Sequence, residues 1–261
     1  MRGLAQLLTS HRDLLYMLTW RDIRIKYKQT VMGFLWAILM PLLIVAAGLL
    51  VRLGLSKVSG EPIELASVLS VAVKALPWSF FIASIRFATV SLTNNIHLVT
   101  KIAFPRAVFP VSAVLSQLFD FFVASTLVVI LLVAAGPGAS ATLFWVPYLL
   151  TLLFVLAIGL SLLLAAANLF FRDVKHIVEV LVTVAIFFTP VFYEVEMFGA
   201  WGSLLMLNPV APILEGLNDC IVDQTAPPLL WILYSTGFGL LGLVVAPALF
   251  QRLEPLFAES I

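Results

Sequence analysis

Charged residues are scarce in this sequence: only 11% of its 261 residues are Asp, Glu, Lys or Arg, whereas 62% are hydrophobic. A soluble globular chain carries about 25% charged residues. A water-soluble fold of this composition would expose large contiguous apolar patches, and such patches drive aggregation. The composition therefore excludes a soluble globular domain and favours an integral membrane protein.

Cysteine is almost absent as well. The single thiol, Cys220, has no second cysteine with which to form a disulfide inside the chain, so the fold does not depend on the redox state of its surroundings. We interpret Cys220 as a packed structural residue, which is the usual place of an unpaired cysteine.

The sequence lacks the short motifs of common catalytic and nucleotide-binding sites. It has no GxxxxGK[ST] phosphate-binding loop, no HExxH metal site and no GxSxG nucleophile elbow. Its three histidines, His11, His97 and His176, fall near predicted membrane boundaries, where an interfacial position is a simpler interpretation than a metal ligand. We therefore expect no catalytic residue, no metal site and no cofactor bound by this chain.

Long apolar runs dominate the rest of the sequence. A helix needs about 20 residues, at ~1.5 Å per residue, to cross ~30 Å of hydrocarbon. The runs are continuously apolar and do not alternate, which predicts helices rather than the strands of a membrane barrel. The sequence thus predicts an all-α integral membrane protein with six transmembrane helices, at residues 31–51, 63–90, 107–135, 141–171, 176–193 and 228–250.

Basic residues are distributed unevenly between the two sides that these spans define. Of the fifteen Lys and Arg residues, eleven fall on the side that carries both termini, two fall on the other side, and two lie within the second span. Because basic residues are retained in the cytoplasm, both termini are predicted to be cytoplasmic. Seven of the fourteen acidic residues fall on the outer side, Glu215 and Asp219 among them.

Residues 11–29 have the pattern of an amphipathic helix at the membrane surface. At 100° per residue, apolar and aromatic side chains form one stripe and basic side chains another: Tyr16, Trp20, Ile23 and Tyr27, and then Arg21, Arg24 and Lys28. Two interpretations stay open, which are a plain membrane anchor and a contact with a partner protein.

The outer stretch 193–227 is long for a connector and half apolar, and Asn208-Pro209 breaks it. We predict two short re-entrant helices between spans five and six. The chain is accordingly divided into a cytoplasmic N-terminal segment with the interfacial helix (1–30), a six-helix transmembrane domain (31–250) and a cytoplasmic C-terminal tail (251–261).

Four charged residues fall well inside predicted spans, away from their ends: Lys74, Arg86, Asp120 and Glu179. Charges in hydrocarbon are costly, so they usually face protein or water. We expect Asp120 to form a structural ion pair with either Lys74 or Arg86, and a substrate contact is the alternative. Glu179 lies one turn into the fifth span, where it can face a water-filled cavity.

Four segments, in this order and spacing, make the chain recognisable. They are RDIRIKYKQT at 21–30 with Gly33, Trp36-Ala37 and Pro41; KIAFPR at 101–106 with Pro110; NLFFRDV at 168–174 with TPVFY at 189–193; and LNPVAP at 207–212. Together they resemble the permease subunits of ABC-2 type exporters of lipid-linked polysaccharides, a family that includes O-antigen, capsule and teichoic acid exporters. The resemblance covers nearly the whole chain.

This resemblance implies a homodimer of permease copies in the bacterial cytoplasmic (inner) membrane, with a role in lipopolysaccharide biosynthesis. It also implies two copies of a separate ABC ATPase, which would bind ATP and Mg, and a lipid-linked glycan substrate. No nucleic acid is expected as a partner. The chain itself would be a permease without its own ATPase site.

The resemblance also implies that cytoplasmic segments receive the motion of the ATPase. The main candidate is residues 94–103, where Asn94 and Asn95 can cap a short helix along the membrane, and the turn 171–175 is a smaller one. Ordinary positive-inside loops are the alternative interpretation. The candidate coupling residues are Arg21, Arg24, Lys28, Asn94, Asn95, His97, Lys101, Arg106, Arg172 and Asp173.

In this family the first and fifth spans are expected near the translocation path. Aromatic rings there would offer a moving sugar chain weak and repeated contacts. The candidate lining residues are Phe34, Trp36, Phe187, Phe188, Phe192 and Tyr193. The alternative is that these rings are lipid-facing bulk and interfacial belts.

Rival functions remain at this point. Within the family, the chain could export teichoic acid, capsule, drugs or small lipids. Outside it, a gradient-driven carrier would use Asp120 and Glu179, and a membrane-embedded enzyme would act on lipid-linked sugars. The enzyme is disfavoured because no set of Asp, Glu and His residues converges in the sequence.

Overall fold

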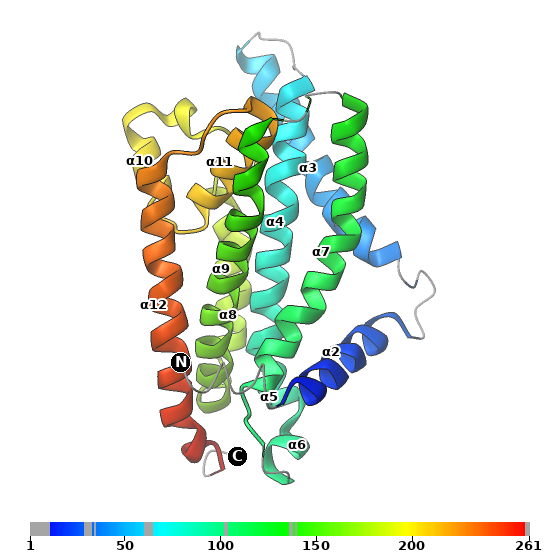
Figure 1. The fold of residues 1–261 in the computed structure, drawn as a ribbon, viewed down its shortest axis with the longest axis vertical. Coiled ribbons are helices and arrows are strands. Elements are labelled where there is room, and N and C mark those ends of the chain that lie inside the picture. The colour runs from blue at the N-terminus through cyan, green and yellow to red at the C-terminus, as the bar shows by residue number, and fades with distance from the viewer. Residues whose placement is uncertain are drawn as a thin grey trace.

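The computed structural model describes residues 11–28, 33, 35–59, 65–101, 104–135, 138 and 140–258. All regular structure in this part of the chain is helical. The long helices stand side by side (Figure 1), and they are α3 (Leu35–Ser59), α4 (Leu65–Thr89), α7 (Val108–Ala135), α8 (Trp145–Phe170) and α12 (Leu229–Leu253).

Shorter elements cluster at the two ends of this bundle. One end carries α5 (Ser91–Asn94), α6 (Ile96–Lys101) and η5 (Glu254–Ala258), with α2 (Arg12–Tyr27) crossing obliquely nearby (Figure 1). The opposite end carries η3 (Val195–Trp201), α10 (Gly202–Leu205), α11 (Ala211–Asn218) and η4 (Asp219–Asp223). The remaining elements are η1 (Ala141–Phe144), α9 (Val174–Ala185) and η2 (Ile186–Phe188).

Five helices in the described part of the chain are long and apolar enough to cross a membrane. They cover Leu35–Gly54, Leu65–Thr89, Val108–Ala134, Ala141–Phe170 and Leu229–Phe257. Five of the six predicted runs are therefore confirmed as candidate spans. Because several of its helices can cross a membrane, the chain is a multi-pass membrane protein.

The predicted span 176–193 is not a single long helix. Here α9 has 12 residues and η2 has three, which together reach only roughly 22 Å at ~1.5 Å per residue. The helix ends at Thr189, whose backbone is extended (φ −122°, ψ 132°). Pro190 explains this end, because a proline disfavours the helical conformation of the residue before it.

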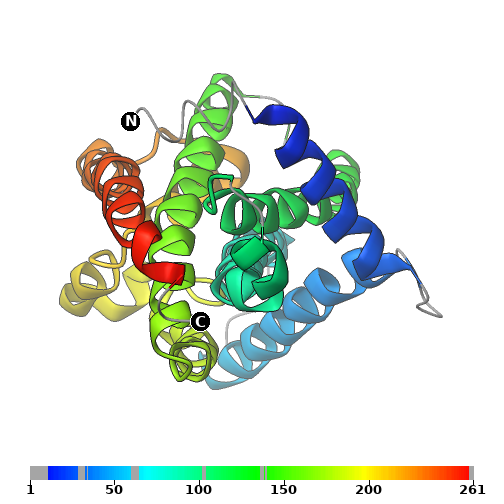
Figure 2. The ribbon, with the colours of Figure 1, turned by 90° about the horizontal axis from the view of Figure 1, so that it is seen from below.

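α4 forms the centre of the bundle. It packs against α3, α7, α8, α9 and α11, and Val71, Ala75 and Ala88 on it are completely buried. Viewed from below, α3, α7 and α8 lie around it, and α12 lies on the far side of α8 (Figure 2). By contrast, α3 and α9 leave most of their side chains exposed.

The predicted outer stretch does contain two helical segments, η3–α10 and α11–η4, separated by the turn at Asn208-Pro209. Every residue of α11 is buried, whereas η3 and α10 expose large apolar side chains such as Trp201 and Leu204. At the other end, the predicted tail begins inside α12. There η5 folds back, so that the ring of Phe257 packs on Phe170 and Phe250.

Candidate functional site

A cavity of about 550 Å³ lies between α3, α4, α7 and α9. The lining residues of α3, α4 and α7 come from the half of each helix nearer to α5 and α6, whereas those of α9 and η2 come from the second half of α9 and from η2. Five aromatic rings form much of its wall: Trp36, Trp78, Phe80, Phe87 and Phe121. Four polar side chains with charge or amide groups also reach it: Lys26, Arg86, Gln117 and Asp120. The cavity is therefore amphipathic, with apolar walls and a few polar groups.

Asp120, on α7, pairs with the interfacial helix and not with another span. Its carboxylate accepts hydrogen bonds from the Lys26 ammonium and the Tyr27 hydroxyl, both on α2. The predicted pairing with Lys74 or Arg86 is therefore wrong. Burial, followed by the hydrogen bond to Asp120, raises the pKa of Tyr27, so its hydroxyl remains a protonated donor.

Lys74 forms the most deeply buried ion pair of the described chain. Its ammonium is fully buried and lies 3.3 Å from Oε1 of Glu215, and it also donates to the carbonyl oxygen of Tyr193 at 3.0 Å. Glu215, which sequence places in an outer loop, lies in α11 and is 8% exposed. Lys74 thus fastens α11 and the segment after η2 to α4.

Arg86 and Glu179 form a third pair, between α4 and α9, with Nε and Oε2 3.0 Å apart. Their side chains are 41% and 56% exposed, so this pair is less buried than the Lys74 pair. Each of the four charges predicted within spans thus has a partner of opposite charge. This pairing supports the structural interpretation of these residues.

The predicted path aromatics are dispersed. Trp36 lines the cavity, whereas Phe187 and Phe188 are 71% and 64% exposed on the outside of η2. Tyr193 turns its ring towards Phe198, with centroids 4.9 Å apart. The remaining candidate at position 34 lies outside the described residues.

Phe192 is a packing residue in this structure, with only 9% of its surface exposed. A Cβ atom added at Gly48 would lie 2.6 Å from the Phe192 ring and 2.5 Å from Cγ1 of Val71. The ring therefore fills the space that a glycine on α3 leaves beside α4. Its place on the wall of a path stays a prediction, and in this structure the ring packs between α3 and α4.

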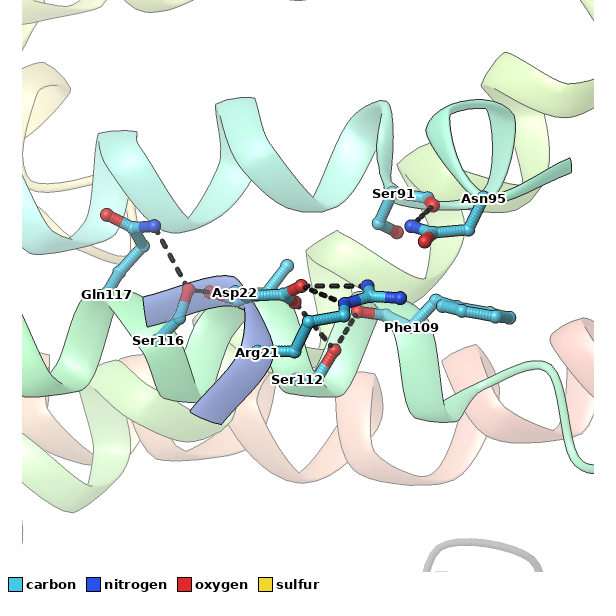
Figure 3. Close-up of polar contacts among 9 residues, drawn as sticks. Arg21, Asp22, Ser91, Asn95, Phe109, Ser112, Ser116 and Gln117 are labelled. Carbon is cyan, nitrogen blue, oxygen red and sulfur yellow. Dashed lines mark hydrogen bonds and ion pairs between the residues drawn. The ribbon is translucent and has the colours of Figure 1, made fainter. Parts of the chain in front are cut away.

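The predicted short helix of the coupling segment is α6. The carbonyl oxygen of Asn95 accepts from the amides of Leu98 and Val99. Its side chain does not cap α6 but turns back and donates to the carbonyl oxygen of Ser91 at 2.8 Å (Figure 3). Asn94 and His97 are exposed. The side chain of the predicted coupling residue Lys101 lies outside the description.

Arg106 is held by the C-terminal segment. Its backbone amide donates to Oε1 of Glu254 at 2.7 Å, and its Nη1 donates to the Glu254 carbonyl oxygen at 2.6 Å. Its Nε also donates to the carbonyl oxygen of Val99 at 3.3 Å. The predicted coupling residue thus connects the end of α6 to η5, which the sequence pattern did not indicate.

A buried asparagine links the predicted coupling turn 171–175 to Thr93, which directly precedes the predicted coupling segment 94–103. Arg172 and Asp173 lie exposed in the turn after α8. Just before it, Oδ1 of Asn168 accepts from the Lys175 amide at 3.0 Å, and its Nδ2 donates to Oγ1 of Thr93 at 3.4 Å. Asn168 belongs to the NLFFRDV motif. A polar amide within an apolar run is the sequence signal that could have singled it out.

The basic stripe of α2 is only partly free. Arg24 and Lys28 are exposed, with the Arg24 guanidinium 5.5 Å from the Trp20 ring centroid. Arg21 instead pairs with Asp22, whose other oxygen accepts from the Ser112 hydroxyl at 3.2 Å (Figure 3). Asp22 was not predicted as a site residue.

Comparison with known proteins identifies the family of this chain. The family model described as ABC-2 type transporter matches residues 13–222. The chain belongs to the ABC-2 type transporter family. As an ABC-2 permease, it is a membrane subunit and not itself the ATPase.

Curated relatives of this ABC-2 permease match it from end to end. One is the O-antigen export system permease protein RfbA of Myxococcus xanthus, 30% identical over 265 residues, with 99% of each chain covered. Another is the protein of the same name from Klebsiella pneumoniae, 27% identical over 252 residues, with 95% of each chain covered. The matched regions therefore span the segments that form the cavity, the coupling segments and α11.

Carboxyl groups gather at the end of the ABC-2 permease that carries α11 and η4. Burial, assisted by the charges of Asp223 and Glu196, raises the pKa of Asp219 from 3.8 to about 6. Burial likewise raises the pKa of Asp223, and Glu194 adds to this shift. Glu194 itself pairs with Arg52 of α3, with Oε1 and Nη2 2.7 Å apart.

Proposed function

We propose that this ABC-2 permease is the membrane-spanning subunit of an ATP-driven exporter that moves an O-antigen-like lipid-linked polysaccharide across the bacterial cytoplasmic membrane. The observation that carries the proposal is the end-to-end match to relatives named O-antigen export permeases. The aromatic wall of the cavity agrees with it, because rings offer sugar and lipid groups weak, repeatable contacts.

The proposal includes six crossings of the membrane. Five crossings are an odd number, so they alone would leave α2 and η5 on opposite sides of the membrane. Both lie at the same end of the bundle, the end that carries α5 and α6 (Figure 1). A sixth crossing by α9, η2 and the segment after them accounts for this. Basic residues are concentrated at that end in the sequence, which supports a cytoplasmic position for it.

We assign α10 and α11, with their flanking η segments, to re-entrant positions in the outer leaflet. The support is that α11 packs against α4 and α8, two of the candidate spans. A buried backbone at membrane depth is tolerated where surrounding protein satisfies it. The Lys74 ammonium contributes to this by binding both Glu215 and the Tyr193 carbonyl oxygen.

A homodimer with two ABC ATPase copies completes the proposal. α3 and α9 expose apolar side chains along their length, including Leu43 and Leu50 on α3 and Val180 and Leu181 on α9. These faces suit contact with a second permease copy, with the path between the copies. ATP and Mg would bind to the ATPase partner, and no cofactor would bind to this chain.

Reconstitution tests the proposal. The permease and its ABC ATPase, purified together from the native source, are placed in proteoliposomes, and movement of a lipid-linked O-antigen polysaccharide is measured with ATP or a non-hydrolysable analogue. We expect transport with ATP only. Transport driven by an ion gradient without the ATPase, or ATP-driven transport of small lipids but no polysaccharide, would contradict it.

A further inference from the structure

The contact between α2 and α7 has an apolar half and a polar half. Near the start of α2, Leu15 and Leu18 are buried. Towards its end, Asp22 accepts from Ser112, and the Lys26 ammonium donates to Oε1 of Gln117 at 2.9 Å and to Asp120. The second half of α2 is thus held to α7 mainly by polar groups, and three of these groups carry a charge.

The polar half of this contact forms part of the cavity wall. Lys26, Gln117 and Asp120 all line the cavity. Viewed from below, α2 crosses α7 and ends near the start of α3 (Figure 2), and Trp36 of α3 also lines the cavity. The end of α2 therefore lies across the cavity at the end of the bundle that carries α5 and α6.

The chemistry of this contact differs from that of the other buried pair. The side chains of Lys26 and Asp120 are 28% and 15% exposed, whereas Lys74 is completely buried in its pair with Glu215. Water and dissolved ions can reach the first pair, so its groups can exchange partners at modest cost. The fully buried pair cannot exchange without leaving a charge unpaired in the core.

We propose that Lys26 and Tyr27 are positioning residues that act through Asp120. Their contact holds the end of α2 against α7 and closes the cavity on the side of α5 and α6. Release of this contact leaves α2 attached through Leu15 and Leu18 and admits molecules to the cavity. A consequence for transport rests on the proposed function, because α2 would then pass motion of the ATPase to α7.

Thiol labelling of the cavity tests the closure directly. Ala83→Cys places a thiol on the cavity wall, and the native Cys220, which is completely buried, reports general loosening of the fold in the same molecule. The permease–ATPase complex in detergent is treated with a small maleimide, and both sites are quantified by mass spectrometry. The variants are Asp120→Asn, Lys26→Met and Tyr27→Phe.

We expect Asp120→Asn and Lys26→Met to raise the labelling rate at position 83 at least tenfold, as a shift of about tenfold in a closed–open equilibrium requires, with no change at Cys220. Tyr27→Phe, which keeps the ring and one ion pair, should give a smaller rise. The charge exchange Lys26→Asp with Asp120→Lys should restore slow labelling. Glu194→Gln, which breaks an ion pair at the other end of the bundle, is the matched control and should change nothing.

Two results would overturn the proposal. One is an unchanged labelling rate at position 83 in Asp120→Asn, and the other is equal acceleration at position 83 and at Cys220. The ratio of polysaccharide moved to ATP hydrolysed, measured on the same variants, tests the consequence for transport. A fall in this ratio supports it, and an unchanged ratio overturns that consequence alone. If the parent complex moves no polysaccharide, the proposed function fails while the labelling result stands.

Discussion

Charged residues in the membrane-spanning part of this permease form ion pairs that the sequence predicts only in part. The charges within spans were correctly expected to find partners, because an unpaired charge in hydrocarbon costs several kcal/mol. The identity of the partners was missed. Lys26 was counted with the cytoplasmic charges, and Glu215 with the outer loops, since neither lies in a long apolar run. Only the fold brings Lys26 to Asp120 and Glu215 to Lys74.

The Lys74–Glu215 pair should respond strongly to loss of one partner. Lys74→Met leaves the Glu215 carboxylate buried without its cation, which costs about 3–5 kcal/mol of the free energy of unfolding. The double variant Lys74→Met with Glu215→Leu should recover most of this loss, because no unpaired charge remains. Unfolding of the purified permease by denaturant in detergent measures both. A single variant as stable as the parent would show that the pair is not buried as described.

The raised pKa of Asp219 predicts that the stability of the permease depends on pH. Its carboxyl has a pKa of about 6 in the folded chain against an ordinary value of 3.8. As the pH rises between these values, the unfolded state loses its proton first, so stability falls through this window and stays lower above it. Asp219→Asn should reduce this fall, as seen in the unfolding temperature at several pH values. An identical pH profile for parent and variant would rule out the raised pKa.

At the scale of elements, local sequence rules explain most of the helices and fail where tertiary contacts decide. Five of the six apolar runs predicted as spans are long helices, and Asn208-Pro209 correctly marked a break. The short α9–η2 follows from Pro190, a signal present in the sequence but outweighed there by the length of the apolar run. The sequence predicts a short re-entrant helix here, but the complete burial of α11 could not be predicted, because it depends on the pairing of Glu215 with Lys74 of α4.

The junction of α6 with η5 gives a prediction at this scale. Arg106→Ala removes the guanidinium donations to Glu254 and Val99, so hydrogen exchange should accelerate in residues 96–101 and 254–258 by about tenfold, the effect of losing roughly 1.4 kcal/mol of local stability. Arg252→Ala changes an exposed arginine on the same end of α12 and serves as the control. Equal hydrogen exchange in the two variants would show that Arg106 does not stabilise the contact between α6 and η5, and would leave contact with the ATPase as its role.

The whole molecule is a bundle built around α4, with two sparsely covered helices, α3 and α9, on its outside. The family was predictable from the order and spacing of four motifs. In the fold these motifs lie at α2, at the junction after α6, at the α8–α9 turn and at the start of α11. The candidate path was less predictable. Aromatic content alone did not separate Trp36, which lines the cavity, from Phe192, which packs between helices.

Two phenylalanines near the end of α9 should therefore behave differently in the assembled exporter. Phe188→Ala removes an exposed ring and should slow polysaccharide transport several-fold, with little change in stability. Phe192→Ala opens a space between α3 and α4 and should cost about 3–5 kcal/mol of unfolding free energy. Transport in proteoliposomes and denaturant unfolding of the same preparations separate the two effects. The reverse pattern would place Phe192, and not Phe188, on the path.

The central claim is that this ABC-2 permease moves a lipid-linked polysaccharide when a separate ATPase hydrolyses ATP. The most direct test is transport of a lipid-linked O-antigen polysaccharide into proteoliposomes that contain the co-purified permease and ATPase. The account predicts movement that requires ATP hydrolysis and both subunits. Polysaccharide movement by the permease without the ATPase, or no movement by an intact complex that still hydrolyses ATP in response to other lipids, would contradict it.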